Sequence, residues 1–389
     1  MKLFEYQGKQ VFARAGIPVP ESRLVMCAER EHDRIAAEAA AAAHELTGRE
    51  RQPVVIKAQL DMGGRGKAGL IRVAADQGEA AAVSREILAG GYRIPALLVE
   101  RAVNIERELY LSLSVDPQRA GFVVLASAEG GVDIERLARE RPDAIRRVHI
   151  DPFRGLQAFQ ARALAYDLGL TDSTVGSFTA LVNALYAVFR NNDAELAEIN
   201  PLFLTAVGEL VAGDSKLIID DNSLYRQSGF ELTREQFDSD IAYAAALDGI
   251  PYVQFDGDIS LMCAGAGLAT TVFDLVNFGG GSVANYLEFG GPNYHKAQRA
   301  MELCLRNRSA VILIVTFGTI ARADVMAQGI VDAIAALKPD RPVVTCIRGT
   351  NEEQAHETLR SAGLEPLLDT EEAVRRAIDL AAQNRGGTS

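Results

Sequence analysis

The chain has 389 residues, of which 48% are apolar, and a formal net charge of −12 at neutral pH. This length allows two or three domains with buried cores. The acidic balance argues against a nucleic-acid or anionic-membrane partner, since either would favour a basic face. No long uncharged apolar run predicts a membrane-spanning helix. The four cysteines are far apart and favour neither a disulfide framework nor a zinc site, so we expect a cytoplasmic protein.

The first half of the chain predicts an α/β arrangement with mixed strands. Apolar periodicity, interrupted at glycine and proline, indicates helices and strands in alternation. Helices are expected at residues 4–15, 30–46, 78–88, from 142 onward, and across 156–190. Strands are expected at residues 54–58, 69–74, 96–100, 107–114 and 121–127, and a hairpin at 195–205 with 209–214.

The second half has a different rhythm. The pattern loosens over residues 222–257, which predicts a domain boundary there, with an N-terminal domain over 1–240 and a C-terminal domain over 256–389. Four strand-then-helix units follow, with strands at residues 259–264, 310–317, 342–347 and 365–368. This alternation predicts a small parallel sheet wrapped by helices.

The most informative segment joins a buried strand to a glycine-rich basic loop. Lys57 lies in the strand at 54–58, and Gly63-Gly64-Arg65-Gly66-Lys67-Ala68-Gly69 follows. Glycines let backbone N–H groups approach phosphate closely, and the basic residues add charge. A Walker A loop is excluded, because Asp61 replaces its first glycine and Ala68 its hydroxyl residue. The segment predicts a nucleotide triphosphate site, with a basic hairpin turn as the alternative.

The predicted hairpin carries oxygen ligands. Glu198 and Asn200 are two residues apart on one strand, so their side chains share a side. The returning strand brings Asp214 alongside them. Mg²⁺ needs only a few protein oxygens when substrate phosphates supply the rest, so Asn200 with Asp214 predict a partial magnesium shell. Solvated hairpin side chains are the alternative.

Two turns in the second half follow predicted strands. Ala264-Gly265-Ala266-Gly267 matches a dinucleotide fingerprint only in part, because Thr270 stands at the third glycine. The turn at residues 317–324 precedes a helix, whose N-terminus can bind an anion. The loop at residues 290–293 is expected to close over the same space or to form a simple β-turn. No serine–histidine–acid arrangement predicts a covalent nucleophile in this chain.

Nearly the whole chain resembles the β subunit of succinate–CoA ligase, an ATP-grasp protein with a C-terminal flavodoxin-like CoA-ligase domain. Five segments carry this resemblance. They are Glu5-Tyr6-Gln7 with Lys9-Gln10 and Phe12-Ala13-Arg14, Gly64-Arg65-Gly66-Lys67-Ala68-Gly69, Glu108-Leu109-Tyr110-Leu111, Gly130-Gly131-Val132-Asp133-Ile134-Glu135, and Glu198-Ile199-Asn200-Pro201-Leu202.

The resemblance implies a set of site residues. The implied catalytic residues are Glu198 and Arg65. The implied nucleotide-binding residues are Lys57, Gly64, Arg65, Gly66, Glu100, Val103 and Glu108. Asn200 and Asp214 would hold Mg²⁺, and the acid and phosphate would meet Ala264, Gly265, Thr319, Ile320 and Ala321. The family uses ATP or GTP and a phosphohistidine on a separate α subunit, which also binds most of the CoA.

The departures from the family pattern lie in the second half. Ala264 stands where the family usually has asparagine, Thr319 where it has glycine, and Pro292 where it has glycine. A site that loses a hydrogen-bonding amide discriminates differently among acids. The chain is thus expected to serve a small di- or tricarboxylic acid, with succinate in doubt. A malate–CoA ligase or citryl-CoA synthetase, a non-catalytic regulatory subunit, and an ATP-grasp ligase working alone are the alternatives.

Overall fold

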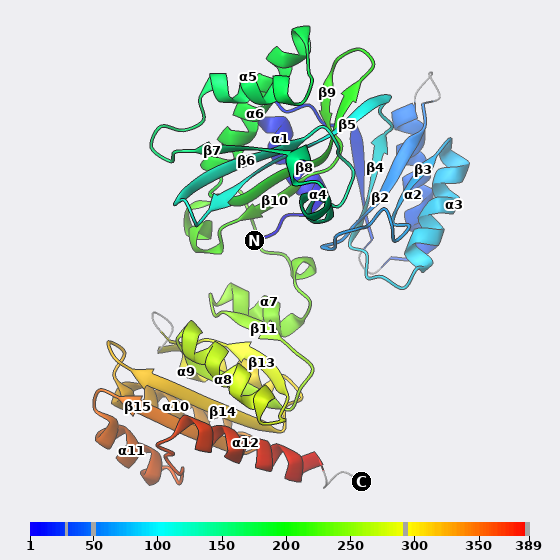
Figure 1. The fold of residues 1–389 in the computed structure, drawn as a ribbon. Coiled ribbons are helices and arrows are strands. Elements are labelled where there is room, and N and C mark those ends of the chain that lie inside the picture. The colour runs from blue at the N-terminus through cyan, green and yellow to red at the C-terminus, as the bar shows by residue number, and fades with distance from the viewer. Residues whose placement is uncertain (28–29, 48–51, 291–294, 386–389) are drawn as a thin grey trace. The chain divides into compact units, whose positions relative to one another are not determined.

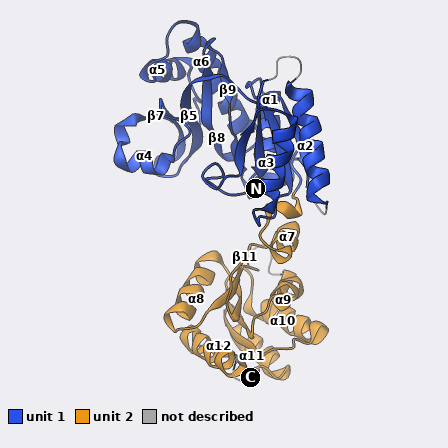
Figure 2. Ribbon diagram, turned by 90° about the vertical axis from the view of Figure 1, so that its right-hand side faces the viewer, with its two compact units in different colours: residues 1–231 blue, residues 232–389 orange. Residues whose placement is uncertain are grey.

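The computed structural model describes residues 1–27, 30–47, 52–290 and 295–385. The chain divides into two compact units, Met1–Glu231 and Leu232–Ser389 (Figure 2). The division falls inside the loosely patterned segment 222–257, but earlier than residue 240, the expected end of the first domain. Residues after 231 belong to the second unit because α7 (Asp240–Leu247) contributes to its core and β11 (Tyr252–Gln254) pairs with one of its strands.

The smaller sheet of the first unit is antiparallel, in the order β1-β4-β2-β3. Its strands are β1 (Ser22–Met26), β2 (Val54–Gln59), β3 (Ile71–Ala74) and β4 (Ala96–Arg101). Two helices, α2 (His32–Thr47) and α3 (Gln77–Ala89), bury their alanine-rich faces against it. Figure 1 labels the strands β2, β3 and β4 and the helices α2 and α3. Because β2 is an inner strand, the backbone on either side of Lys57 is fixed by two neighbouring strands.

The larger sheet of the first unit runs β10-β8-β5-β6-β7, and β9 also pairs with β8. Its strands are β5 (Ile105–Asp116), β6 (Gly121–Ser127), β7 (Ile145–Ile150), β8 (Ala194–Thr205), β9 (Leu210–Ala212) and β10 (Lys216–Ile219). The accompanying helices are α1 (Glu5–Arg14), α4 (Ile134–Glu140), α5 (Ala158–Asp167), α6 (Asp172–Asn191) and the 3₁₀ turns Pro142–Ala144 and Asp221–Arg226. Helix α6 packs on β8, as expected of its apolar stripe.

The first unit differs from the prediction in several details. Strands β1 and β10 and helix α4 were not expected. The helix expected across 156–190 is two helices, because Gly169 takes a positive φ of 70° and Thr171 begins a new N-terminus. The helix expected from 142 is a single 3₁₀ turn. The chain then enters β7, an edge strand whose charged, solvent-facing side chains conceal its strand character.

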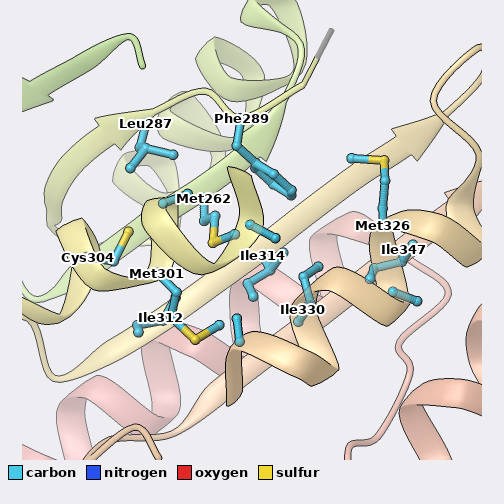
Figure 3. Packing of buried hydrophobic residues seen from close by; sticks show 14 of the residues in the cluster. Met262, Leu287, Phe289, Met301, Cys304, Ile312, Ile314, Met326, Ile330 and Ile347 are labelled. Atoms are coloured by element: carbon cyan, nitrogen blue, oxygen red, sulfur yellow. The ribbon is translucent and has the colours of Figure 1, made fainter. Parts of the chain in front are cut away.

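The second unit is a three-layer α/β structure. Its sheet has the order β11-β13-β12-β14-β15, and only β11 is antiparallel. The strands are β12 (Ile259–Ala264), β13 (Val283–Leu287), β14 (Val311–Gly318) and β15 (Val343–Gly349), and the helices are α8 (Ala266–Phe278), α9 (Ala297–Leu305), α10 (Ala323–Leu337), α11 (Glu352–Ser361), α12 (Thr370–Arg385) and the 3₁₀ turn Arg234–Gln236. Figure 3 shows the core on one face, where Met262 and Ile314 meet Met301, Met326 and Ile330.

The predicted parallel sheet is confirmed, with one exchange of strands and with one addition, the antiparallel strand β11, which lies where no strand was expected. Residues 365–368 add only the isolated bridge between Thr345 and Pro366, whereas β13, which the four expected units omitted, is a full member. The chain leaves β12 in one direction, to β13, and continues in the other, to β14 and β15. The carboxyl ends of β12 and β14 thus border a topological switch point, where open α/β sheets commonly bind ligands.

Candidate active site

A cavity of about 770 Å³ lies in the first unit, beside the glycine-rich flap. Its volume is in the range of cofactor and nucleotide sites. It is bordered by the first residues of the chain, by residues 60–67 and 131–135, by β8, and by residues 214–216. Six of the predicted site residues line it, namely Gly64, Arg65, Gly66, Glu198, Asn200 and Asp214.

Six ionisable side chains beside this cavity form what we term the charge cluster: Glu5, Lys9, Lys57, Arg65, Glu100 and Asp214. They come from α1, β2, the flap, β4 and the turn after β9. Three carboxylates face three cations, so the cluster is electrically neutral when all six are ionised. A buried set of charges requires this kind of mutual pairing.

Lys57 lies at the centre of the charge cluster. Its Nζ is 2.8 Å from Glu5 Oε1 and 2.7 Å from Glu100 Oε2, and it donates to the carbonyl oxygen of Gly213 at 2.6 Å. Burial alone would lower the pKa of Lys57, but the two carboxylates outweigh it and raise the pKa above its ordinary value. The ammonium therefore stays charged at neutral pH.

Arg65 belongs to the charge cluster and also lines the cavity. Its Nη2 is 2.8 Å from Glu5 Oε2 and 3.0 Å from Asp214 Oδ2, while Nη1 donates to the carbonyl of Ala58 at 3.0 Å. Burial, followed by the nearby Glu5 carboxylate, raises the pKa of Asp214 to about 6, although Arg65 acts in the opposite sense. The Asp214 side chain keeps 27% exposure, so it can still reach a ligand in the cavity.

Asn200 and Glu198 point into the cavity from the same strand, as their spacing predicts. Asn200 Oδ1 accepts from the N–H of Gly131 at 2.8 Å, and its Nδ2 donates to the Val132 carbonyl. The amide oxygen keeps a second lone pair for a metal. Glu198 Oε2 accepts from the Tyr110 hydroxyl at 3.0 Å, and burial raises the pKa of Glu198.

Four predicted nucleotide residues lie outside the described lining of this cavity. Lys57 and Glu100 are buried in the charge cluster, with side chains 9% and 2% exposed. Glu108 is exposed on β5, where its carbonyl accepts from the N–H of Gly130, and Val103 lies in the segment between β4 and β5. Of these four residues, Glu100 contacts the side chains of Lys9 and Lys57.

In the second unit, the two predicted turns lie at neighbouring strand ends. Ala264 is in register with Thr316, so the starts of α8 and α10 share one edge of the sheet. Gly265 has a φ of 101°, which only glycine adopts readily, and it turns the chain into α8. Thr319 and Ile320 are exposed, Ile320 completely.

Around these turns the backbone segments approach closely. A Cβ on Gly290 would lie 2.8 Å from the nitrogen of Gly265, which explains glycine at that position. The hydrogen bond from Arg322 is the main cause that lowers the pKa of Asp324, to about 2. The remainder of the predicted loop, Gly291, Pro292 and Asn293, lies outside the described residues.

Sequence reasoning missed three members of the site. Glu5 and Lys9 were noted only for the resemblance, yet both are buried in the charge cluster. Their spacing of four residues places them on one helix face and could have suggested an ion pair. The carbonyl of Gly213 gave no signal, because a backbone acceptor has no side-chain pattern.

None of the five histidines, all of which the structure describes, is among the cavity's lining residues. His356 is buried beside the Ile347 carbonyl, with its Nε2 at 2.9 Å, and His149 pairs with Asp116.

Comparison with known families accounts for both units. A model of the ATP-grasp domain matches residues 2–204, and a model of the CoA-ligase domain matches residues 262–380. The chain belongs to the succinyl-CoA synthetase β-like family. The α/β fold expected from the sequence is confirmed, and this family member is a β-like subunit of an ADP-forming acid–CoA ligase.

Curated relatives cover nearly the whole β-like chain. An ADP-forming sulfoacetate-CoA ligase subunit, SauC of Bilophila wadsworthia, is 54% identical over 385 residues, covering 98% of this chain and 99% of the relative. SqwK of Acholeplasma sp., another such subunit, is 51% identical, covering 98% and 92%. The succinate–CoA ligase [ADP-forming] subunit beta of Ignicoccus hospitalis is 39% identical, covering 98% and 99%.

These relatives support two general conclusions, on the nucleotide and on the partner. An ADP-forming ATP-grasp ligase implies ATP as a substrate, and the description of each relative as a subunit implies an α-type partner.

A solved ATP citrate lyase from Methanothrix soehngenii, in complex with citrate and coenzyme A, shares the fold with a TM-score of 0.73 at 20% identity, covering 97% of this chain and 99% of that one. Along the described part of the chain, no helix combines the length and apolarity needed to cross a bilayer.

Proposed function

We propose that this chain is the nucleotide-binding β subunit of a ligase that activates sulfoacetate, a two-carbon acid with one carboxylate and one sulfonate. The reaction would be sulfoacetate + CoA + ATP = sulfoacetyl-CoA + ADP + phosphate. The supporting observation is that two sulfoacetate-CoA ligase subunits are 54% and 51% identical across 98% of the chain, against 39% for a succinate–CoA ligase subunit.

In the proposed nucleotide site, the flap residues Gly64 and Gly66 lend backbone N–H groups to the phosphates, and Arg65 with Lys57 neutralises them. The oxygens of Asn200 and Asp214 both face the cavity and fit Mg²⁺, a cation that takes one or two carboxylates plus substrate phosphates. Bound Mg²⁺ would offset phosphate charge during transfer.

Proposed roles also follow for the remaining cavity residues. Glu198, with its raised pKa, faces the space where phosphoryl transfer to the partner would occur. A phosphohistidine on the α-type partner would carry the phosphoryl group, since none of this chain's histidines is among the lining residues described for the cavity. Val103 and Glu108 would serve the base and ribose, and Glu100, which sequence reasoning assigned to the same role, would instead support the site as the buried partner of Lys9 and Lys57.

The departures in the second unit suit a sulfonate. A sulfonate is tetrahedral with three acceptor oxygens, so it needs more room than a planar carboxylate. Ala264 is smaller than the asparagine usual in the family, and Thr319 adds a hydroxyl where glycine is usual. Gly265, Ile320 and Ala321 lie in the same two turns, whose helix N-termini favour anions.

The test is an acid panel. The chain is co-expressed with its α-type partner, and CoA-dependent ADP formation is measured with sulfoacetate, succinate, malate and citrate. We expect kcat/KM for sulfoacetate to exceed that for each other acid by at least about tenfold, which corresponds to roughly 1.4 kcal/mol of transition-state binding. A preference for succinate or citrate would reject the sulfoacetate assignment, and no ADP with any acid would favour the regulatory alternative.

A further inference from the structure

The first turns of α1 bring a glutamate and a lysine into the nucleotide site. The side chains of Glu5 and Lys9 are 1% and 5% exposed, and Lys9 Nζ is 2.9 Å from Glu5 Oε1. An exposed i,i+4 pair on a helix contributes little, whereas this pair meets Lys57, Arg65 and Glu100 beneath the cavity.

Counting hydrogen-bond donors shows what the charge cluster leaves for a nucleotide. An ammonium group has three N–H donors. Those of Lys57 are directed to Glu5, Glu100 and the Gly213 carbonyl. Lys9 has contacts with the same three partners, at 2.9, 2.6 and 2.8 Å. In this arrangement Lys57 has no donor left for phosphate, so one of its partners must be exchanged.

The surroundings indicate which partner leaves. The Gly213 carbonyl belongs to a backbone segment that is fixed in place, because the N–H of Gly213 donates to the Pro201 carbonyl oxygen at 2.9 Å. Glu100 lies on the inner strand β4, outside the described cavity lining. Glu5, in contrast, is a lining residue, and its carboxylate occupies both Lys57 and Arg65. A phosphate group entering the cavity therefore meets Glu5 before the other two partners.

We propose that Glu5 is the resident counterion of the nucleotide site, and that ATP phosphates replace its carboxylate on Lys57 and Arg65. Lys9 keeps the displaced carboxylate paired, so that no buried charge is left alone. This inference rests on the proposed nucleotide site at Lys57 and Arg65. No covalent bond changes, because the exchange replaces one oxygen anion by another around the same cations.

The first test is Glu5→Gln in the complex with the α-type partner. The amide preserves the shape of the side chain but competes weakly for the cations. We expect the Kd of ATP, measured by calorimetry, to fall by about tenfold, with adenosine binding unchanged because adenosine has no phosphate. Glu86→Gln, an exposed glutamate paired with Arg72, is the matched control and should leave both constants unchanged. An unchanged or higher Kd for ATP would overturn the proposal.

The second test examines Lys9. Lys9→Gln removes the group that receives the displaced carboxylate, so the Kd of ATP should rise at least about threefold, and this rise should vanish in the Glu5→Gln background. The double variant keeps the cluster neutral and guards against a folding defect, which circular dichroism would report. Equal effects in the two backgrounds would contradict the exchange. Failure of the unmodified complex to bind ATP would instead reject the proposed function.

Discussion

At the residue scale, the site depends on a neutral set of buried charges. Glu100 is 2% exposed and is shared by Lys9 and Lys57, so its charge helps to offset two largely buried ammonium groups. Breaking a buried pair by removing one member costs more than the pair contributes, because the remaining charge is uncompensated.

Glu100→Gln should therefore destabilise the first unit by about 3–5 kcal/mol, the range typical of an unpaired buried charge. Urea unfolding monitored by circular dichroism measures the change. Glu45→Gln removes a carboxylate from an exposed pair with Arg23 and serves as the control, with an expected change within about 0.5 kcal/mol. Equal stabilities of the two variants would show that the cluster is not energetically coupled.

Asp214 gives the site a pH dependence of definite sign. Its pKa in the folded chain, about 6, exceeds the ordinary value, so its contribution to stability is largest below the ordinary value and is lost as the pH rises through about 6. Mg²⁺ requires the ionised carboxylate. We expect Mg²⁺-dependent ADP binding to strengthen between pH 5 and pH 7, and Asp214→Asn to remove most of that change. Titration calorimetry at several pH values would measure the Kd of ADP. A Kd that does not change with pH would contradict the assignment of Asp214 to the Mg²⁺ site.

At the scale of elements, the second unit depends on the close approach of two strand ends. Gly349, at the end of β15, has a φ of 115°, and a Cβ there would lie 2.0 Å from the carbonyl oxygen of Gly318 at the end of β14. The same strand end leads into the turn at Thr319 and Ile320. The glycine therefore lets the chain place this turn at the edge of the sheet without steric overlap.

Gly349→Ala should destabilise the second unit by at least about 2 kcal/mol, since it combines a left-handed backbone with a backbone clash. Gly267→Ala is the matched control, because Gly267 lies in α8 and, among the described residues outside its own helical turn, no atom lies within 4 Å of an added Cβ. Alanine there should stabilise the helix by about 0.5–1 kcal/mol. Thermal unfolding compares the two, and opposite shifts in Tm are expected.

At the scale of the molecule, the predicted functions fall on separate units. The cavity with its charge cluster belongs to the first unit. The N-terminus of α8 at Gly265, and the N-terminus of α10 that follows the turn at Thr319, belong to the second. None of the chain's histidines lies in the described cavity lining. We therefore expect the chain to bind ATP alone and to transfer phosphate only when the partner is present.

Radioactive γ-phosphate of ATP provides the measurement. The isolated chain should bind ATP without becoming labelled, whereas addition of the α-type partner should yield an acid-labile, alkali-stable label on the partner. Lys57→Ala should reduce this labelling at least about a hundredfold, while Arg72→Ala, on the exposed edge strand β3, should not. Stable labelling of this chain by itself would support a ligase that works alone.

The sequence alone determined those features that depend on local periodicity. Alternation along β8 predicted that Glu198 and Asn200 share a side, and the strand and glycines around Lys57 predicted the flap, because side-chain direction and glycine conformation are local properties. The charged edge strand β7 escaped prediction, since its outward residues conceal the alternation.

Tertiary structure alone decided which distant charges meet. Glu5, Lys57, Glu100 and Gly213 come from four separate elements or turns, and no local pattern indicates that they converge. Glu100, which sequence reasoning assigned to the nucleotide, is buried and paired with Lys9 and Lys57. The physical reason is that periodicity reports which side of an element is buried, whereas the groups it meets there depend on long-range strand pairing and helix packing.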